Sequence, residues 1–104
     1  MSNLADRLGE FDQREEAVTA AGEAVELWRR MATRHSSTYL HELASSVYDN
    51  ARHLSAAGHQ EKALAAAGEA VNLYQWLVAT DSLRLYDTKL KQTEQMLVRL
   101  RNAL

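Results

Sequence analysis

The chain has 104 residues, a formal net charge of −2, no cysteine and no proline. This length allows one domain with a modest hydrophobic core, and the slightly acidic charge argues against nucleic-acid binding, which needs a basic patch to displace counterions from phosphates. No disulfide or thiolate metal site is possible without cysteine, and with no signal peptide or membrane span of ~20 apolar residues in the sequence we expect a cytoplasmic protein.

Apolar residues recur at helical spacing along the chain, which predicts an all-α fold. Asp12 and Glu15 resemble a capping box and predict a turn before a second helix, and Gly58 predicts the end of a third. The pattern predicts five helices, over residues 3–11, 13–33, 38–57, 60–78 and 82–102.

Two stretches of the chain, residues 17–28 and 63–74, are nearly the same. They are 46 residues apart and are identical at eight of twelve positions, which indicates an internal repeat. Applied to the whole chain, the offset makes the first, third and fifth predicted helices equivalent (A helices), and likewise the second and fourth (B helices). Gly22 and Gly68 lie mid-helix at the same repeat position, and we expect each to allow close approach of a neighbouring helix.

The repeat divides the single domain, residues 1–104, into three parts. Residues 1–35 form a first repeat whose A helix is cut short at Met1, residues 36–80 form a second, and residues 81–104 form a C-terminal capping or dimerising helix. The short first helix suggests a fragment of a longer array, or a chain completed by self-association.

The spacing of small and large residues resembles the tetratricopeptide repeat. Ala5 and Leu8 precede a turn at Asp12 and then Ala17-Val18-x-x-Ala21-x-x-Ala24-Val25-x-Leu27, and Ala51, Leu54 and Gly58 precede Ala63-Leu64-x-x-Ala67-x-x-Ala70-Val71-x-Leu73-Tyr74. The period is longer than the usual 34 residues and is nearer the 42-residue variety of kinesin light chain and many actinobacterial proteins. The resemblance implies a right-handed array of antiparallel helical hairpins, about two and a half repeats long.

Proteins with such repeats bind peptides or partner helices on the face formed by their A helices. The resemblance therefore implies a non-enzymatic protein–protein interaction module. Tyr48 and Arg52 are the favoured pair, because they lie one turn apart and belong to residue types enriched in binding hot spots. The implied partner-binding residues are Ser45, Tyr48, Asp49, Arg52, Asp6 and Lys91. The alternative interpretation is that they form only the solvated side of a helix.

Leucine recurs every seven residues in the last predicted helix, at Leu83, Leu90, Leu97 and Leu104. This spacing is typical of a coiled-coil seam, which favours a homodimeric scaffold as an alternative function. A terminal helix that caps the array explains the same leucines equally well.

A third possibility is a sensor domain with a small-ligand site around Tyr48 and Trp28. The four histidines form no His-x-x-x-His pair or His-Glu-x-x-His motif, so we expect no metal and no cofactor. Neither a nucleophile motif nor a glycine-rich phosphate loop is recognisable, and an enzyme is the least favoured class.

Overall fold

The computed structural model describes residues 3–34, 36–80 and 84–103, and places side chains in residues 9–34, 38–80 and 84–103. It confirms the all-α prediction. The described residues form four helices and contain no strand: α1 (Asn3–Arg34), α2 (Ser36–Ala56), α3 (Gln60–Thr80) and α4 (Asp87–Ala103).

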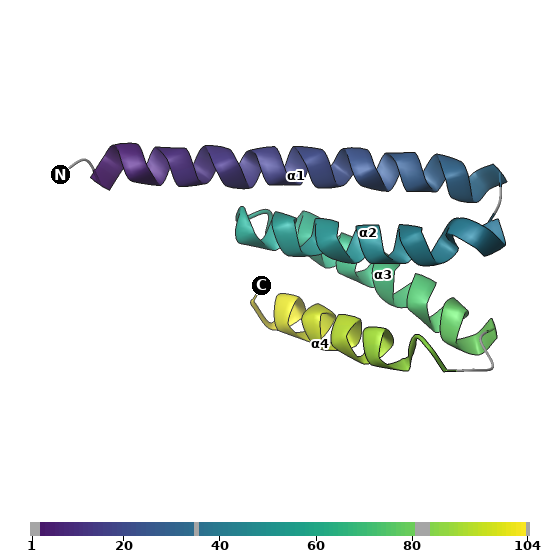
Figure 1. The fold of residues 1–104 in the computed structure, drawn as a ribbon. Coiled ribbons are helices and arrows are strands. Elements are labelled where there is room, and N and C mark those ends of the chain that lie inside the picture. The colour runs from purple at the N-terminus through teal and green to yellow at the C-terminus, as the bar shows by residue number, and fades with distance from the viewer. Residues whose placement is uncertain (1–2, 35, 81–83, 104) are drawn as a thin grey trace.

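Each helix runs antiparallel to the one before it and packs beside it (Figure 1). α1 forms one edge of the molecule, α2 lies next to it, and α3 and α4 follow in order. The result is an elongated array with extents of 56 × 30 × 20 Å.

The turn predicted at Asp12 is absent, and the first two predicted helices are one continuous helix of 32 residues. The backbone at position 58 of the second repeat shows what a chain break at position 12 would require. Gly58 has a φ of 87°, a conformation that glycine adopts without steric cost. It ends α2 with two hydrogen bonds typical of a Schellman motif, from Gly58 N to Ser55 O (3.1 Å) and from His59 N to Leu54 O (2.8 Å). Asp12 stands at the equivalent position and is followed by Gln13, Arg14 and Glu15, which are good helix formers, so the helix continues through it.

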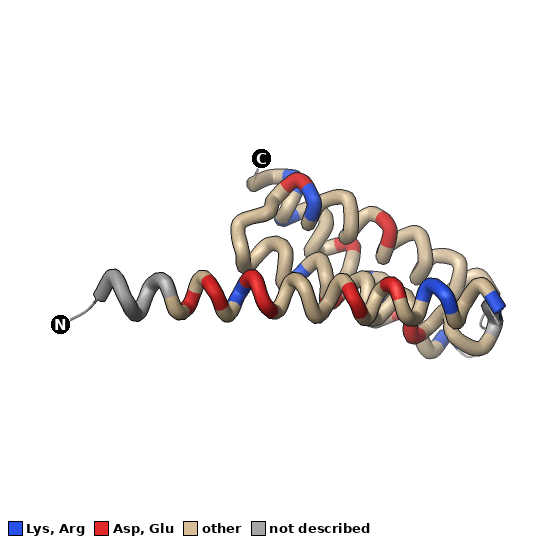
Figure 2. The backbone as a smooth tube through the Cα atoms, turned by 90° about the horizontal axis from the view of Figure 1, so that it is seen from above, with Lys and Arg blue, Asp and Glu red and all other residues tan. Residues whose placement is uncertain are grey.

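One consequence of the unbroken helix is that the N-terminal part of α1 projects beyond the other helices (Figures 1 and 2). The side chains placed in this part are exposed from Gly9 to Arg14, and Phe11 is 53% exposed. The truncated A helix predicted for the first repeat is therefore a straight extension of the helix that follows it.

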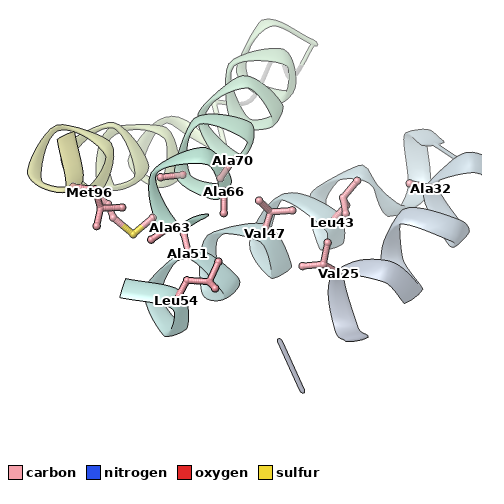
Figure 3. Close-up of a cluster of buried hydrophobic side chains, with 12 residues drawn as sticks. Val25, Ala32, Leu43, Val47, Ala51, Leu54, Ala63, Ala66, Ala70 and Met96 are labelled. Carbon is pink, nitrogen blue, oxygen red and sulfur yellow. The ribbon is translucent and has the colours of Figure 1, made fainter. Parts of the chain in front are cut away.

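The core consists of two adjoining clusters of buried side chains. The larger cluster joins all four helices and includes Val25, Val47, Ala51, Ala66 and Met96 (Figure 3). The smaller cluster is centred on Tyr74, with Ala44 and Leu77. Many of the buried residues of α3 are alanines, and small side chains allow α2 and α4 to lie against it.

The two mid-helix glycines do not mark a close helix contact, contrary to the prediction. A Cβ atom added at Gly22 or at Gly68 would meet nothing within 4 Å. The shared glycine is thus a feature of the repeated sequence that helix packing does not require.

The last helix begins at Asp87, later than the predicted start at 82. Arg84 has a φ of 58°, which is incompatible with a right-handed helix. Ser82 lies outside the described residues.

Candidate interaction surface between α2 and α4

Tyr48 is half-buried on α2, beside the residues that enter the core, and it packs against both core clusters. Two cations lie near its ring. Cζ of Arg52 is 5.8 Å from the ring centroid, and Nζ of Lys89, on α4, is 5.9 Å from it. An aromatic face attracts such cations through its quadrupole. The ring therefore links α2 to α4 and has a cation from each helix beside it.

Arg52 is also paired with Asp49, one turn before it on α2. The distance from Arg52 Nη2 to Asp49 Oδ1 is 3.2 Å, and the side chains are 55% and 49% exposed. An ion pair this exposed contributes at most about 1 kcal/mol to folding. It orients the guanidinium group while leaving it accessible to a partner.

Ser45, also predicted to bind a partner, is half-buried and contacts the core. It forms a side-chain hydrogen bond with Tyr74, which is only 1% exposed. Burial raises the pKa of Tyr74 to about 12, against the smaller lowering effect of the hydrogen bond with Ser45. Ser45 thus fixes a buried phenol that stays neutral well above neutral pH.

A groove of about 420 Å³ continues from Arg52 along α2 and α4. Its apolar lining includes Met96 and Leu100, and its charged residues are Arg52 and Arg99. Gln60 also lines it. The Gln60 amide nitrogen donates to the Ser55 carbonyl at 3.5 Å, whereas its buried Oε1 atom has no hydrogen-bond partner among the described residues. A partly apolar surface with two guanidinium groups suits a segment that carries carboxylates.

The other predicted partner-binding residues do not join this cluster. Lys91 lines a different hollow, of about 600 Å³, together with Glu94, Gln95, Val98 and Arg99. Lys89, two residues earlier, is the α4 cation beside Tyr48. The side chain of Asp6 lies outside the described residues.

The residues missed by sequence reasoning are Lys89, Arg99 and Gln60. Their contribution depends on how α4 and the start of α3 sit against α2, and no local pattern in the sequence signals it. The repeat offset also gives no guide here, because it pairs Lys89 with the buried residue Leu43.

The leucines of the predicted coiled-coil seam divide into two groups. Leu90 and Leu97 are half-buried and pack against the core clusters. Leu83 and Leu104 lie outside the described residues. The large apolar side chain that is exposed on α4 is Val98, at 49%.

Histidine side chains make structural contacts. His59 Nε2 lies 2.8 Å from Glu15 Oε1, which ties the start of α3 to α1. His41 is 3.2 Å from the neighbouring Glu42 carboxylate and lies against the ring of Tyr86. In the described part of the chain, no group of three or more metal-ligating side chains is placed to hold an ion. His35 lies outside that part.

None of the described helices is long and apolar enough to cross a membrane. In comparisons with known proteins, no family model, no curated protein and no solved structure matches this chain. The resemblance to tetratricopeptide repeats therefore has only the two spaced sequence motifs as its basis.

Proposed function

We propose that this chain is a non-enzymatic protein–protein interaction module, built on tetratricopeptide-like hairpins. It binds a peptide or a partner helix along the groove between α2 and α4. The observation that carries the proposal is the composition of this groove. Arg52 and Arg99 stand beside apolar residues, of which Ala56 and Ala103 are exposed and Met96 and Leu100 form a nearly buried floor.

The charges around the groove also indicate the chemistry of the partner. Arg52, Lys89 and Arg99 all come from α2 and α4, and Tyr48 supplies an aromatic surface between two of them. Arginine and tyrosine are enriched in binding hot spots, and a guanidinium group pairs with carboxylates through two parallel hydrogen bonds. The partner segment should therefore combine acidic side chains with one or two apolar anchors.

Selection from a random peptide library displayed on phage tests this proposal. Peptides selected on the wild-type chain should be enriched in aspartate, glutamate and large apolar residues. Their binding, measured by fluorescence anisotropy, should weaken at least tenfold in the Arg52→Glu variant, because two charge-assisted contacts become repulsive.

Lys62→Glu is the matched control, since Lys62 is an exposed cation on α3 and its substitution changes the net charge by the same amount. Equal loss of binding in both variants would show that only overall charge matters. Selection of peptides without acidic residues, or binding indifferent to Arg52, would contradict the proposal.

A further inference from the structure

α1 carries two neighbouring apolar stripes, and only one of them contributes buried residues to the core. The first includes Val25 and Ala32, which are buried in the core. The second alternates steps of three and four residues, the spacing of a helix–helix seam. It consists of Ala17, Ala20, Ala24, Leu27 and Met31. In this second stripe Ala20 is exposed and Leu27 is 54% exposed, whereas the other three are half-buried. Its alanines border a shallow hollow shared with Ser46, Asp49 and His53 of α2.

The second repeat shows what this stripe is suited to contact. Its counterparts on α3 are Ala63, Ala66, Ala70, Leu73 and Leu77. Ala63 and Ala70 are 0% exposed, and Ala66 is 8% exposed. Figure 3 shows the three alanines beside α2, near Val47 and Ala51. The same pattern of small residues thus packs against a helix on α3 and is only partly covered on α1.

Charged residues flank the second stripe of α1, which we call the open stripe, in a definite order along the helix. Glu16, Glu23 and Arg30 follow one another at seven-residue steps, and all three are exposed. None of them forms an ion pair within the described part of the chain. Figure 2 shows the same order along α1, with most acidic positions before the basic ones at its C-terminal end. The first part of this flank is therefore negative and its end is positive.

We propose that the open stripe binds the same stripe of a second copy of this chain, with the two α1 helices antiparallel. An antiparallel pair places the acidic part of each flank against the basic end of the other. In a parallel pair Glu16 and Glu23 would instead face Ala21 and Trp28 of the other copy, and no pair of opposite charges would form. The charge order thus complements itself about a two-fold axis, which is the requirement for an isologous interface.

The side-chain sizes give a register for this pair. With the two-fold axis near residues 25 and 26, Leu27 of one copy lies opposite Ala24 of the other, and Met31 lies opposite Ala20. Each large side chain then meets a small one. Because of the two-fold symmetry, the pair contains two contacts between Glu23 of one copy and Arg30 of the other. The paired segments run from residue 17 to residue 34, roughly 27 Å of helix.

This surface is distinct from the groove proposed to bind a partner. α1 packs on one part of α2, whereas the groove lies between α2 and α4. The inference therefore does not depend on the proposed function, and a dimer of this kind leaves two grooves available.

Sedimentation equilibrium over a concentration series tests the inference with charge exchanges. Glu23→Arg and Arg30→Glu each turn two attractive contacts into two repulsive ones, so each should weaken dimerisation about tenfold. The double variant Glu23→Arg/Arg30→Glu restores opposite charges across the axis and should dimerise nearly as well as the wild type. Failure of the double variant to recover would overturn the antiparallel arrangement.

A second pair of variants tests the apolar seam. Leu27→Glu should leave a folded monomer, because Leu27 is exposed within one copy. Trp76→Glu is the control, since Trp76 is a similarly exposed apolar side chain, at 51%, on α3, and this variant should remain dimeric. Circular dichroism checks that both variants are folded. A wild-type chain that stays monomeric at every concentration, or a dimer that survives Leu27→Glu, overturns the proposal.

Discussion

Residues 17–28 and 63–74 are nearly identical in sequence but lie in different surroundings. The segment on α3 is covered by α2 on one side and by α4 on the other, whereas the segment on α1 is covered by α2 alone. Ala66 is therefore buried while its counterpart Ala20 is exposed. The repeated pattern thus specifies a helix with two packing faces, and the neighbouring helices decide which of these faces are filled.

The largest expected effect comes from placing one charge at equivalent positions. Ala66→Glu buries a carboxylate between α2 and α3 without a partner, so it should lower the free energy of unfolding by about 3 kcal/mol or more. Ala20→Glu adds the same group to an exposed surface and should change stability by no more than about 0.5 kcal/mol. Urea unfolding followed by circular dichroism measures both, and similar losses would show that the two faces are equally covered.

The second-largest expected effect is a loss of folding stability at alkaline pH through Tyr74, whose counterpart on α1 is Trp28. Burial raises the pKa of Tyr74 from 10.0 to about 12. Below pH 10 the phenol is protonated in the folded and unfolded chains alike, and the full stability is present. Between pH 10 and 12 the unfolded chain loses this proton first, so stability falls as the pH rises.

Denaturant titrations at pH 9 and pH 11.5 test this linkage. The wild type should lose up to about 2 kcal/mol between the two values through this group. Tyr74→Phe removes the ionisable phenol and should reduce that loss. An unchanged pH dependence in Tyr74→Phe would mean that other groups cause the alkaline instability.

A third test exchanges the residues that distinguish the two hairpins. Gly58→Ala puts a Cβ on a residue with a φ of 87°, so it should cost about 1 kcal/mol of stability. Asp12→Ala, in the exposed interior of α1, should be neutral or slightly stabilising, since alanine has the higher helix propensity. If Asp12 lay in a turn as Gly58 does, removal of its capping oxygen would instead destabilise the chain.

The smallest expected effect comes from the paired glycines. Gly22→Ala and Gly68→Ala should each raise the free energy of unfolding by about 0.5 to 1 kcal/mol, because alanine is the better helix former and the added Cβ meets no atom within 4 Å. Differential scanning calorimetry would record this as a higher Tm. A lower Tm in either variant would indicate a close helix contact at that glycine.

Much of the fold follows from the sequence, because its determinants are local. Apolar periodicity and Gly58 place α2 at Ser36–Ala56 and α3 at Gln60–Thr80, within two residues of the predicted bounds. The turn predicted from the capping-box pattern of Asp12 and Glu15 is wrong, because this pattern does not break a helix without a residue such as Gly58, whose φ of 87° ends α2. Repeat equivalence thus predicts packing faces better than it predicts chain breaks.

The candidate site was predictable only in part. Helical spacing alone brings together Tyr48, Asp49 and Arg52, because they lie within about one turn of α2. The approach of Lys89 and Arg99 depends on the rotation of α4 against α2 and α3, which tertiary packing decides. For the same reason Lys91, placed by analogy with the A-helix face, lies in another hollow.

The difference between the two repeated segments can be measured directly by cysteine labelling, because the chain has no cysteine of its own. Ala20→Cys and Ala66→Cys each introduce a single thiol at equivalent positions of α1 and α3. At a low protein concentration Cys introduced at position 20 should react with a thiol reagent at nearly the rate of an unfolded peptide, and the thiol at position 66 should react far more slowly. Equal rates at the two positions would contradict the account, because the face left open on α1 would then be covered, or the face buried on α3 would be open.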